Sequence, residues 1–150
     1  MQYFVTKDVL PTQSIDCIAV AVFEGNQLSP AAATLNTARW LNESAATQAV
    51  SCLAEAPVKE RTTAWKIRQT IINTETALYR YSQTKSQFKP VEKPLTRLGF
   101  MASEADIDTL EKACDTGAAI GRGMNLAREL GNLPGNICTP KSHKIRTGFR

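Results

Sequence analysis

Hydrophobic and polar positions follow two kinds of pattern along this 150-residue chain. Short apolar, β-prone runs at residues 3–5, 49–53 and 95–101 predict strands. A longer run at residues 15–23 is apolar at nearly every position, as expected of a strand buried on both faces, and is predicted to be the central strand. The run at residues 49–53 could pair beside the strand that precedes it in the chain.

Helical periodicity separates these runs. Ser29 and Pro30 indicate an N-cap followed by proline at the first helical position, and an Ala-rich helix is expected over residues 31–41. A long helix is predicted from a stripe of 3.6-residue periodicity formed by Ala64, Ile67, Ile71, Thr74, Leu78 and Tyr81. Residues 82–94 are polar and are expected to form a loop.

A last helix is expected over residues 104–130, with Ser103 and Asp106 approximating a capping box. Its predicted buried stripe consists of Ile107, Leu110, Cys114, Gly117, Ile120, Met124, Ala127 and Leu130. Gly117 and Gly121 would permit close approach of another backbone. Gly131 and Pro134 indicate a left-handed C-cap followed by a residue that cannot continue the helix.

The alternation of strands and helices predicts an α/β fold, with a mixed or largely parallel sheet flanked by helices. Residues 1–130 are expected to form one domain, and residues 131–150 the start of an interdomain linker with a basic tail. Four basic residues account for the whole net charge of +4, namely Lys141, Lys144, Arg146 and Arg150. The neutral body argues against strong electrostatic DNA binding, and the tail is expected to be a solvated end.

Composition also bears on location. No signal sequence and no apolar run long enough to span a membrane is apparent, which predicts a cytoplasmic protein without a membrane partner. Cys17, Cys52, Cys114 and Cys138 form no Cys-x-x-Cys pair, so reduced and partly buried thiols are expected.

The search for catalytic chemistry is negative. The chain contains no Gly-x-Ser-x-Gly, no phosphate-binding loop and no His-Glu-x-x-His. His143 is the single histidine and lies in the tail, so it is not expected to be catalytic or to hold a metal unaided. Asp106 and Asp108 are interpreted as complementing a helix dipole rather than as metal ligands. Arg122 and Arg128 could bind phosphate or a partner subunit, or lie on a solvated or interface face. No catalytic, cofactor-binding or metal-binding residue is predicted.

One stretch, Arg128-Glu-Leu-x-Asn-x-Pro-x-Asn136-x-x-Thr139-Pro140, resembles the segment that joins the N-terminal domain of leucyl (cytosol) aminopeptidases to their catalytic domain. Residues 17–30, 65–69 and 117–130 are similar to the same domain and occur in the family's order. The resemblance implies a macro-domain-like α/β fold and a hexameric assembly. It also implies that a two-metal (Mn or Zn) catalytic domain releases N-terminal amino acids, preferably leucine, from peptides.

The chain departs from this family in three places. The signature Asn-Thr-Asp-Ala-Glu-Gly-Arg is absent, a segment with a Gly-rich turn and a buried strand is missing between Asn36 and Trp40, and residues 141–150 lack the expected apolar pattern. We therefore predict a truncated or rearranged copy without the catalytic domain. Alone it is expected to be inactive and at most an assembly module, partnered by the catalytic domain or by itself. The alternative is a stand-alone nucleic-acid- or nucleotide-binding module.

Overall fold

The computed structural model describes residues 1–7, 17–19, 46–84, 95–102 and 106–139, and the statements below concern this part of the chain. Its elements, in chain order, are the strands β1 (Gln2–Thr6), β2 (Cys17–Ala19) and β3 (Gln48–Ser51), the 3-10 turn η2 (Leu53–Glu55), the helix α2 (Thr63–Leu78), the strand β4 (Arg97–Met101) and the helix α3 (Ile107–Asn132).

The strands form one sheet in the order β1-β4-β3-β2, and all three strand pairs are parallel. Helix α2 connects β3 to β4, as parallel neighbours require a crossover connection. The predicted α/β fold with a largely parallel sheet is therefore confirmed, and its macro-domain-like character stays a prediction. The predicted central strand was placed wrongly, since β2 stands at one end of this order and β4 and β3 hold the inner positions.

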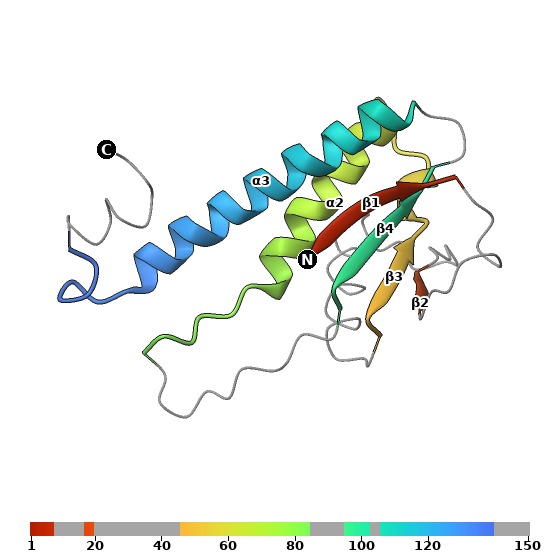
Figure 1. The fold of residues 1–150 in the computed structure, drawn as a ribbon. Helices are drawn as coiled ribbons and strands as arrows, with labels where there is room; N and C mark the ends of the chain where they lie inside the picture. The colour runs from red at the N-terminus through yellow and green to blue at the C-terminus, as the bar shows by residue number, and fades with distance from the viewer. Residues whose placement is uncertain (8–16, 20–45, 85–94, 103–105, 140–150) are drawn as a thin grey trace, which may run out of the picture.

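The core lies between the sheet and the two long helices, which run side by side along one face of the sheet (Figure 1). Alternate residues of the strands point into it, so that Leu98 and Phe100 of β4 join Ala49 of β3, with Tyr3 and Val5 of β1 packed against them. The helices contribute Ile67, Ile71, Leu110, Cys114 and Ala118. The β-prone runs at residues 3–5, 49–53 and 95–101 thus contain strands, as predicted.

Helix α2 begins after the N-cap residue Thr62. The hydroxyl of Thr62 accepts a hydrogen bond from the backbone N–H of Trp65 at 3.2 Å, which satisfies one donor of the first turn. The buried residues of the helix are Ile67, Ile71, Thr74 and Leu78, as the stripe predicts. The helix ends at Leu78, so the extension of the stripe to Tyr81 was wrong by about one turn.

Helix α3 begins at Ile107 with Asp106 as its N-cap, three residues later than predicted. The carboxylate of Asp106 accepts from the backbone N–H of Asp108 at 3.3 Å and from the hydroxyl of Thr109 at 2.9 Å. These bonds, the one from Thr109 first, lower the pKa of Asp106. Its carboxylate is therefore occupied in capping.

The predicted end of this helix was also wrong. Gly131 lies inside α3 without a left-handed backbone, and the C-cap is Leu133, in an extended conformation. Pro134 disfavours helical geometry in the residue before it, and burial of Leu133 holds the turn in place. Residues 131 and 132, which were predicted to belong to the linker, are therefore the last two residues of the helix.

Gly117 and Gly121 confirm the predicted close approach of two backbones. A Cβ at Gly117 would lie 3.0 Å from the backbone oxygen of Arg68, and one at Gly121 would lie 2.7 Å from Cβ of Glu75. Because contacts advance together along both helices, α2 and α3 run parallel to each other.

The buried stripe of α3 was correct only in its first half. Leu110, Cys114 and Gly117 are buried as predicted, together with Ala118 and Gly121. Ile120, Met124 and Ala127 of the predicted stripe are exposed. Residues spaced about 3.5 apart rotate around the axis of an α-helix by about 20° every seven residues. The early residues of the stripe therefore face α2, and the later ones do not.

Several predictions concern residues outside the described ranges. These are the helix at residues 31–41, the junction between Asn36 and Trp40, most of the loop at residues 82–94, Ser103, His143 and the basic tail.

Candidate functional site

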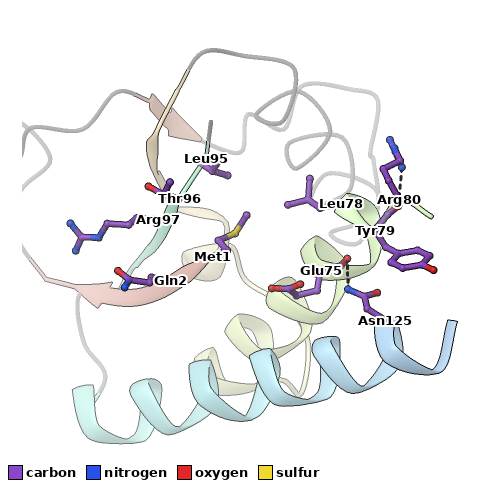
Figure 2. Close-up of a pocket in the computed structure, with 10 residues that line it drawn as sticks. All are labelled: Met1, Gln2, Glu75, Leu78, Tyr79, Arg80, Leu95, Thr96, Arg97 and Asn125. Carbon is purple, nitrogen blue, oxygen red and sulfur yellow. Dashed lines mark hydrogen bonds between the residues drawn. The ribbon is translucent and has the colours of Figure 1, made fainter. Parts of the chain in front are cut away.

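A hollow among the described residues has a volume of about 570 Å³. It lies between the amino ends of β1 and β4 and the last turn of α2, with one residue of α3 at its wall (Figure 2). The lining residues are Met1, Gln2, Glu75, Leu78, Tyr79, Arg80, Leu95, Thr96, Arg97 and Asn125. A second hollow of about 310 Å³ shares Met1, Gln2 and Arg97 and extends to Arg122.

The position of both hollows argues against a nucleotide site. Open parallel sheets bind ligands outside the carboxyl ends of their strands, where loops and helix N-termini meet. Met1, Gln2, Thr96 and Arg97 stand at or before the amino ends of β1 and β4. The hollows therefore lie at the opposite edge of the sheet from the usual ligand position.

Glu75, the acidic residue that lines the larger hollow, already accepts a hydrogen bond. The hydroxyl of Tyr3 donates a hydrogen bond of 2.6 Å to Oε1 of Glu75. Burial, followed by this hydrogen bond and the charge of Glu75, raises the pKa of Tyr3 far above its ordinary value. Tyr3 thus stays a neutral donor that ties β1 to α2, and the pair is not an acid–base couple at neutral pH.

Side chains close the last turn of α2, where backbone carbonyls lack partners within the helix. From α3, Nδ2 of Asn125 donates to the carbonyl of Glu75 at 3.1 Å and Nη1 of Arg128 donates to that of Thr76 at 3.4 Å. Nη1 of Arg80 donates to the carbonyl of Ala77 at 3.3 Å. The guanidinium groups also place positive charge at the negative end of the helix dipole.

A second set of contacts lies one turn further along α3. The hydroxyl of Tyr79 donates to Oε2 of Glu129 at 2.9 Å and accepts from Nδ2 of Asn132 at 3.3 Å. The Arg128 guanidinium lies 5.9 Å from the centre of the Tyr79 ring. Burial raises the pKa of Tyr79, and its bond to Glu129 adds to this effect. We call Tyr79, Asn125, Arg128, Glu129 and Asn132 the α2–α3 clasp.

The clasp gives a structural meaning to the segment that carries the family resemblance. Arg128, Glu129 and Asn132 belong to that segment, and each contacts the end of α2. Arg128 therefore serves inside the domain rather than as an anion site. Arg122 is exposed and lines the smaller hollow, away from the clasp.

One polar atom of the clasp is left over. Oδ1 of Asn125 is buried without a hydrogen-bond partner among the described residues, while Nδ2 of the same amide is bonded to Glu75.

Replacing Arg128 tests the clasp. Arg128→Met is expected to lower the free energy of unfolding by about 1 kcal/mol, because the Thr76 carbonyl loses a charged donor and the Tyr79 ring loses its cation. Arg122→Met is the matched control, since its side chain is exposed on the same helix, and it should change stability by less than about 0.5 kcal/mol. Urea unfolding followed by circular dichroism measures both. Equal losses would contradict a special role for Arg128.

The described residues contain no group of three or more His, Cys, Asp or Glu side chains that could hold a metal ion. The two-metal chemistry that the family resemblance implies therefore finds no fit in this part of the chain. In the same residues no helix has the length and apolarity needed to cross a membrane.

Among the described residues, the thiols of Cys52, Cys114 and Cys138 are free, as predicted. Sγ of Cys52 donates to Sδ of Met101 at 3.8 Å, and burial raises its pKa. Burial and the neighbouring charges of Asp115 and Glu111 raise the pKa of Cys114 from 9.0 to about 12. Cys52 and Cys114 are therefore protonated at neutral pH and are not activated nucleophiles.

This shift predicts a loss of stability in alkali. A thiol with a folded-state pKa above its unfolded value favours folding below the unfolded pKa, and that contribution is lost as the pH rises from about 9 to about 12. Urea midpoints should therefore fall over this window, and fall less in Cys114→Ala than in the wild-type chain. Cys138→Ala serves as the control. The same slope in Cys114→Ala and the wild type would contradict the assignment.

The chain is similar in sequence to part of several known proteins. The chain is 45% identical over 94 residues to a probable cytosol aminopeptidase of Alkalilimnicola ehrlichii, a match that covers 62% of this chain and 19% of the relative. It is 43% identical over 104 residues to that of Thioalkalivibrio sulfidiphilus, covering 69% and 21%. Its relatives are cytosol aminopeptidases. The chain spans about a fifth of their length, which corresponds to the N-terminal domain of this family.

Two further comparisons complete this picture. No protein-family model matches the chain. Among solved structures, the bottromycin maturation enzyme BotP matches with a TM-score of 0.59 and 25% identity over 78% of this chain and 23% of that one. BotP in complex with Mn matches with a TM-score of 0.58 and 24% identity, over 79% of this chain and 23% of that one. The cytosol aminopeptidase resemblance that the sequence shows is thus confirmed, whereas Mn is a property of the BotP complex.

Proposed function

We propose that this chain is a non-catalytic assembly module equivalent to the N-terminal domain of a cytosol aminopeptidase, and that its partner is the catalytic domain of such an enzyme. The observation that carries the proposal is the extent of the similarity. Identity of 43–45% is high, yet it is confined to 19–21% of the relatives' length. Such identity in one domain is expected where that domain keeps the fold and contacts of its relatives.

The chemistry of the described residues supports a non-catalytic role. Glu75 accepts from Tyr3, and Arg128 and Glu129 belong to the clasp. The thiols of Cys52 and Cys114 are protonated at neutral pH. Release of N-terminal amino acids, with the two divalent metals that the family resemblance implies, would fall to the catalytic domain. We expect the chain to act in the cytoplasm, since its relatives are named cytosol aminopeptidases.

The first test measures activity and association together. We expect the purified chain to show no Mn²⁺- or Zn²⁺-dependent hydrolysis of leucine p-nitroanilide. When it is co-expressed with the Alkalilimnicola ehrlichii enzyme lacking its own N-terminal domain, the two should co-purify, and light scattering should give a mass above that of either part. The full-length relative, which already carries this domain, is the control and should not capture the chain.

Two results would contradict the proposal. Metal-dependent turnover by the chain alone would show that it contains an active site. Failure to co-purify with an active catalytic part would show that the similarity has not preserved a contact surface.

A further inference from the structure

Two sulfur atoms lie side by side at the carboxyl ends of β3 and β4. Sγ of Cys52 is 3.8 Å from Sδ of Met101, although the two residues are 49 positions apart in the sequence. The two strands are neighbours in the sheet (Figure 1), and Ser51 of β3 is paired with Phe100 of β4. The residue that follows each of them, Cys52 or Met101, therefore stands at the same level of the sheet. The parallel register thus brings a thiol and a thioether together.

The backbone on both sides of this sulfur pair is held in place. Cys52 is the N-cap of η2, and its carbonyl accepts a hydrogen bond from the N–H of Glu55 at 3.1 Å. The N–H of Ala102, the residue after Met101, donates to the carbonyl of Thr6 at 3.2 Å. Cys52 and Met101 themselves are only half-buried. The two sulfur atoms therefore have a defined spacing and some access from solvent.

The sulfur pair lies at the edge of the sheet where a ligand site is expected. Open parallel sheets bind ligands outside the carboxyl ends of their strands. Cys52 directly follows β3, and Met101 is the last residue of β4. Burial, followed by the negative charge of Glu55, raises the pKa of Cys52. The same charge favours a cation beside this thiol.

The two donors decide which cation fits. Thiolate and thioether sulfur are soft ligands that suit Cu(I), whereas Mg²⁺ and Ca²⁺ prefer oxygen ligands. Structural Zn²⁺ sites need four ligands, and the described part of the chain has no group of three or more His, Cys, Asp or Glu side chains that could supply them. Two metal–sulfur bonds of about 2.3 Å, the length of a zinc–thiolate bond, span at most about 4.6 Å. One ion bound to both sulfur atoms therefore fits their 3.8 Å separation in a bent geometry.

We infer that Cys52 and Met101 form a binding site for a soft monovalent metal ion, Cu(I). On binding, the thiol releases its proton to water, and the thiolate and the thioether each donate an electron pair to the metal. Among the free cysteines that the structure describes, Cys52 is the one whose thiol contacts a thioether. The site goes beyond the proposed function and is independent of it, since neither residue belongs to the clasp.

The test is an anaerobic competition for Cu(I) between the full chain and the chelator ferrozine, followed by the absorbance of the copper–ferrozine complex. The wild-type chain should withdraw one ion per chain. Met101→Leu should weaken binding at least tenfold, because it removes one of two sulfur ligands and nearly keeps the side-chain volume. Met124→Leu is the matched control, since Met124 is exposed on α3, and it should bind as the wild type does. Cys52→Ser should abolish binding, whereas Cys138→Ser should not.

Three results would overturn the inference. Equal affinity of Met101→Leu and Met124→Leu would exclude the thioether as a ligand, and equal losses in Cys52→Ser and Cys138→Ser would show that copper binds to any free thiol. Native mass spectrometry should find one ion on one 16.4 kDa chain, and an ion held between two chains would assign it to an intermolecular link. If Met101→Leu lowers the urea midpoint, copper X-ray absorption of the wild-type complex decides instead: two sulfur neighbours support the site, and a single one overturns it.

Discussion

Phe100→Ala is expected to lower the free energy of unfolding by about 3–5 kcal/mol, the usual cost of removing a buried aromatic ring. Phe100 is fully buried on β4, an inner strand that pairs with β1 and β3. Its ring lies 6.5 Å from that of Tyr3, and the helices pack over both. Since the sheet and the helices meet at this side chain, the surrounding residues cannot close the space without moving a layer.

The loss should be visible in urea unfolding and in the thermal midpoint, and Phe4→Ala is the control variant. Phe4 lies on the other face of the sheet and is only partly buried, with its ring beside Gly99 and under Arg97. Phe4→Ala should therefore lower the free energy of unfolding by clearly less than Phe100→Ala does. A smaller loss for Phe100→Ala than for Phe4→Ala would show that the core is centred elsewhere.

Gly117→Leu is expected to destabilise the chain by about 1–3 kcal/mol through overpacking. A Cβ at this position would lie 3.0 Å from the backbone oxygen of Arg68 and 3.1 Å from Cβ of Ile71. Both atoms belong to the interior of α2, which cannot move away without breaking its own hydrogen bonds. The two helices would have to separate, and the core below them would loosen.

Gly123→Leu is the matched control, because the same substitution enters the same helix where no atom lies within 4 Å. There the gain in helix propensity should dominate and stabilise the chain by about 0.5–1 kcal/mol. The two variants should thus change the urea midpoint in opposite directions. If both raised it, the contact between α2 and α3 at Gly117 would not be as close as described.

Local patterns were sufficient for much of this fold. The strand at residues 3–5 follows from a short β-prone run, and the buried positions of α2 follow from a period of 3.6 residues, which depends only on backbone geometry. The need for glycine at positions 117 and 121 could also be predicted, since a glycine on a buried stripe leaves room for another backbone. The position of the longest apolar run within the sheet could not, because strand order depends on pairing between distant segments.

The clasp lay beyond sequence reasoning. Glu129 and Asn132 were noticed only as part of a family-like segment, and Arg128 was otherwise considered only for phosphate or a partner subunit. Nothing local shows that Tyr79 and Thr76 lie opposite them. The end of α2 at Leu78, which the sequence did not predict, leaves carbonyls in the last turn that need donors from elsewhere in the chain.

By itself the sequence determined the α/β class, the approximate helices and strands and the relationship to cytosol aminopeptidases, because these depend on local periodicity and on short motifs. Only the tertiary structure decided that α3 passes Gly131 and ends at Asn132, and that its apolar stripe is half covered and half exposed. The physical reason is the same in both cases. Where a helix ends and which of its faces is buried depend on the neighbour it packs against, and α2 stops before the stripe of α3 does.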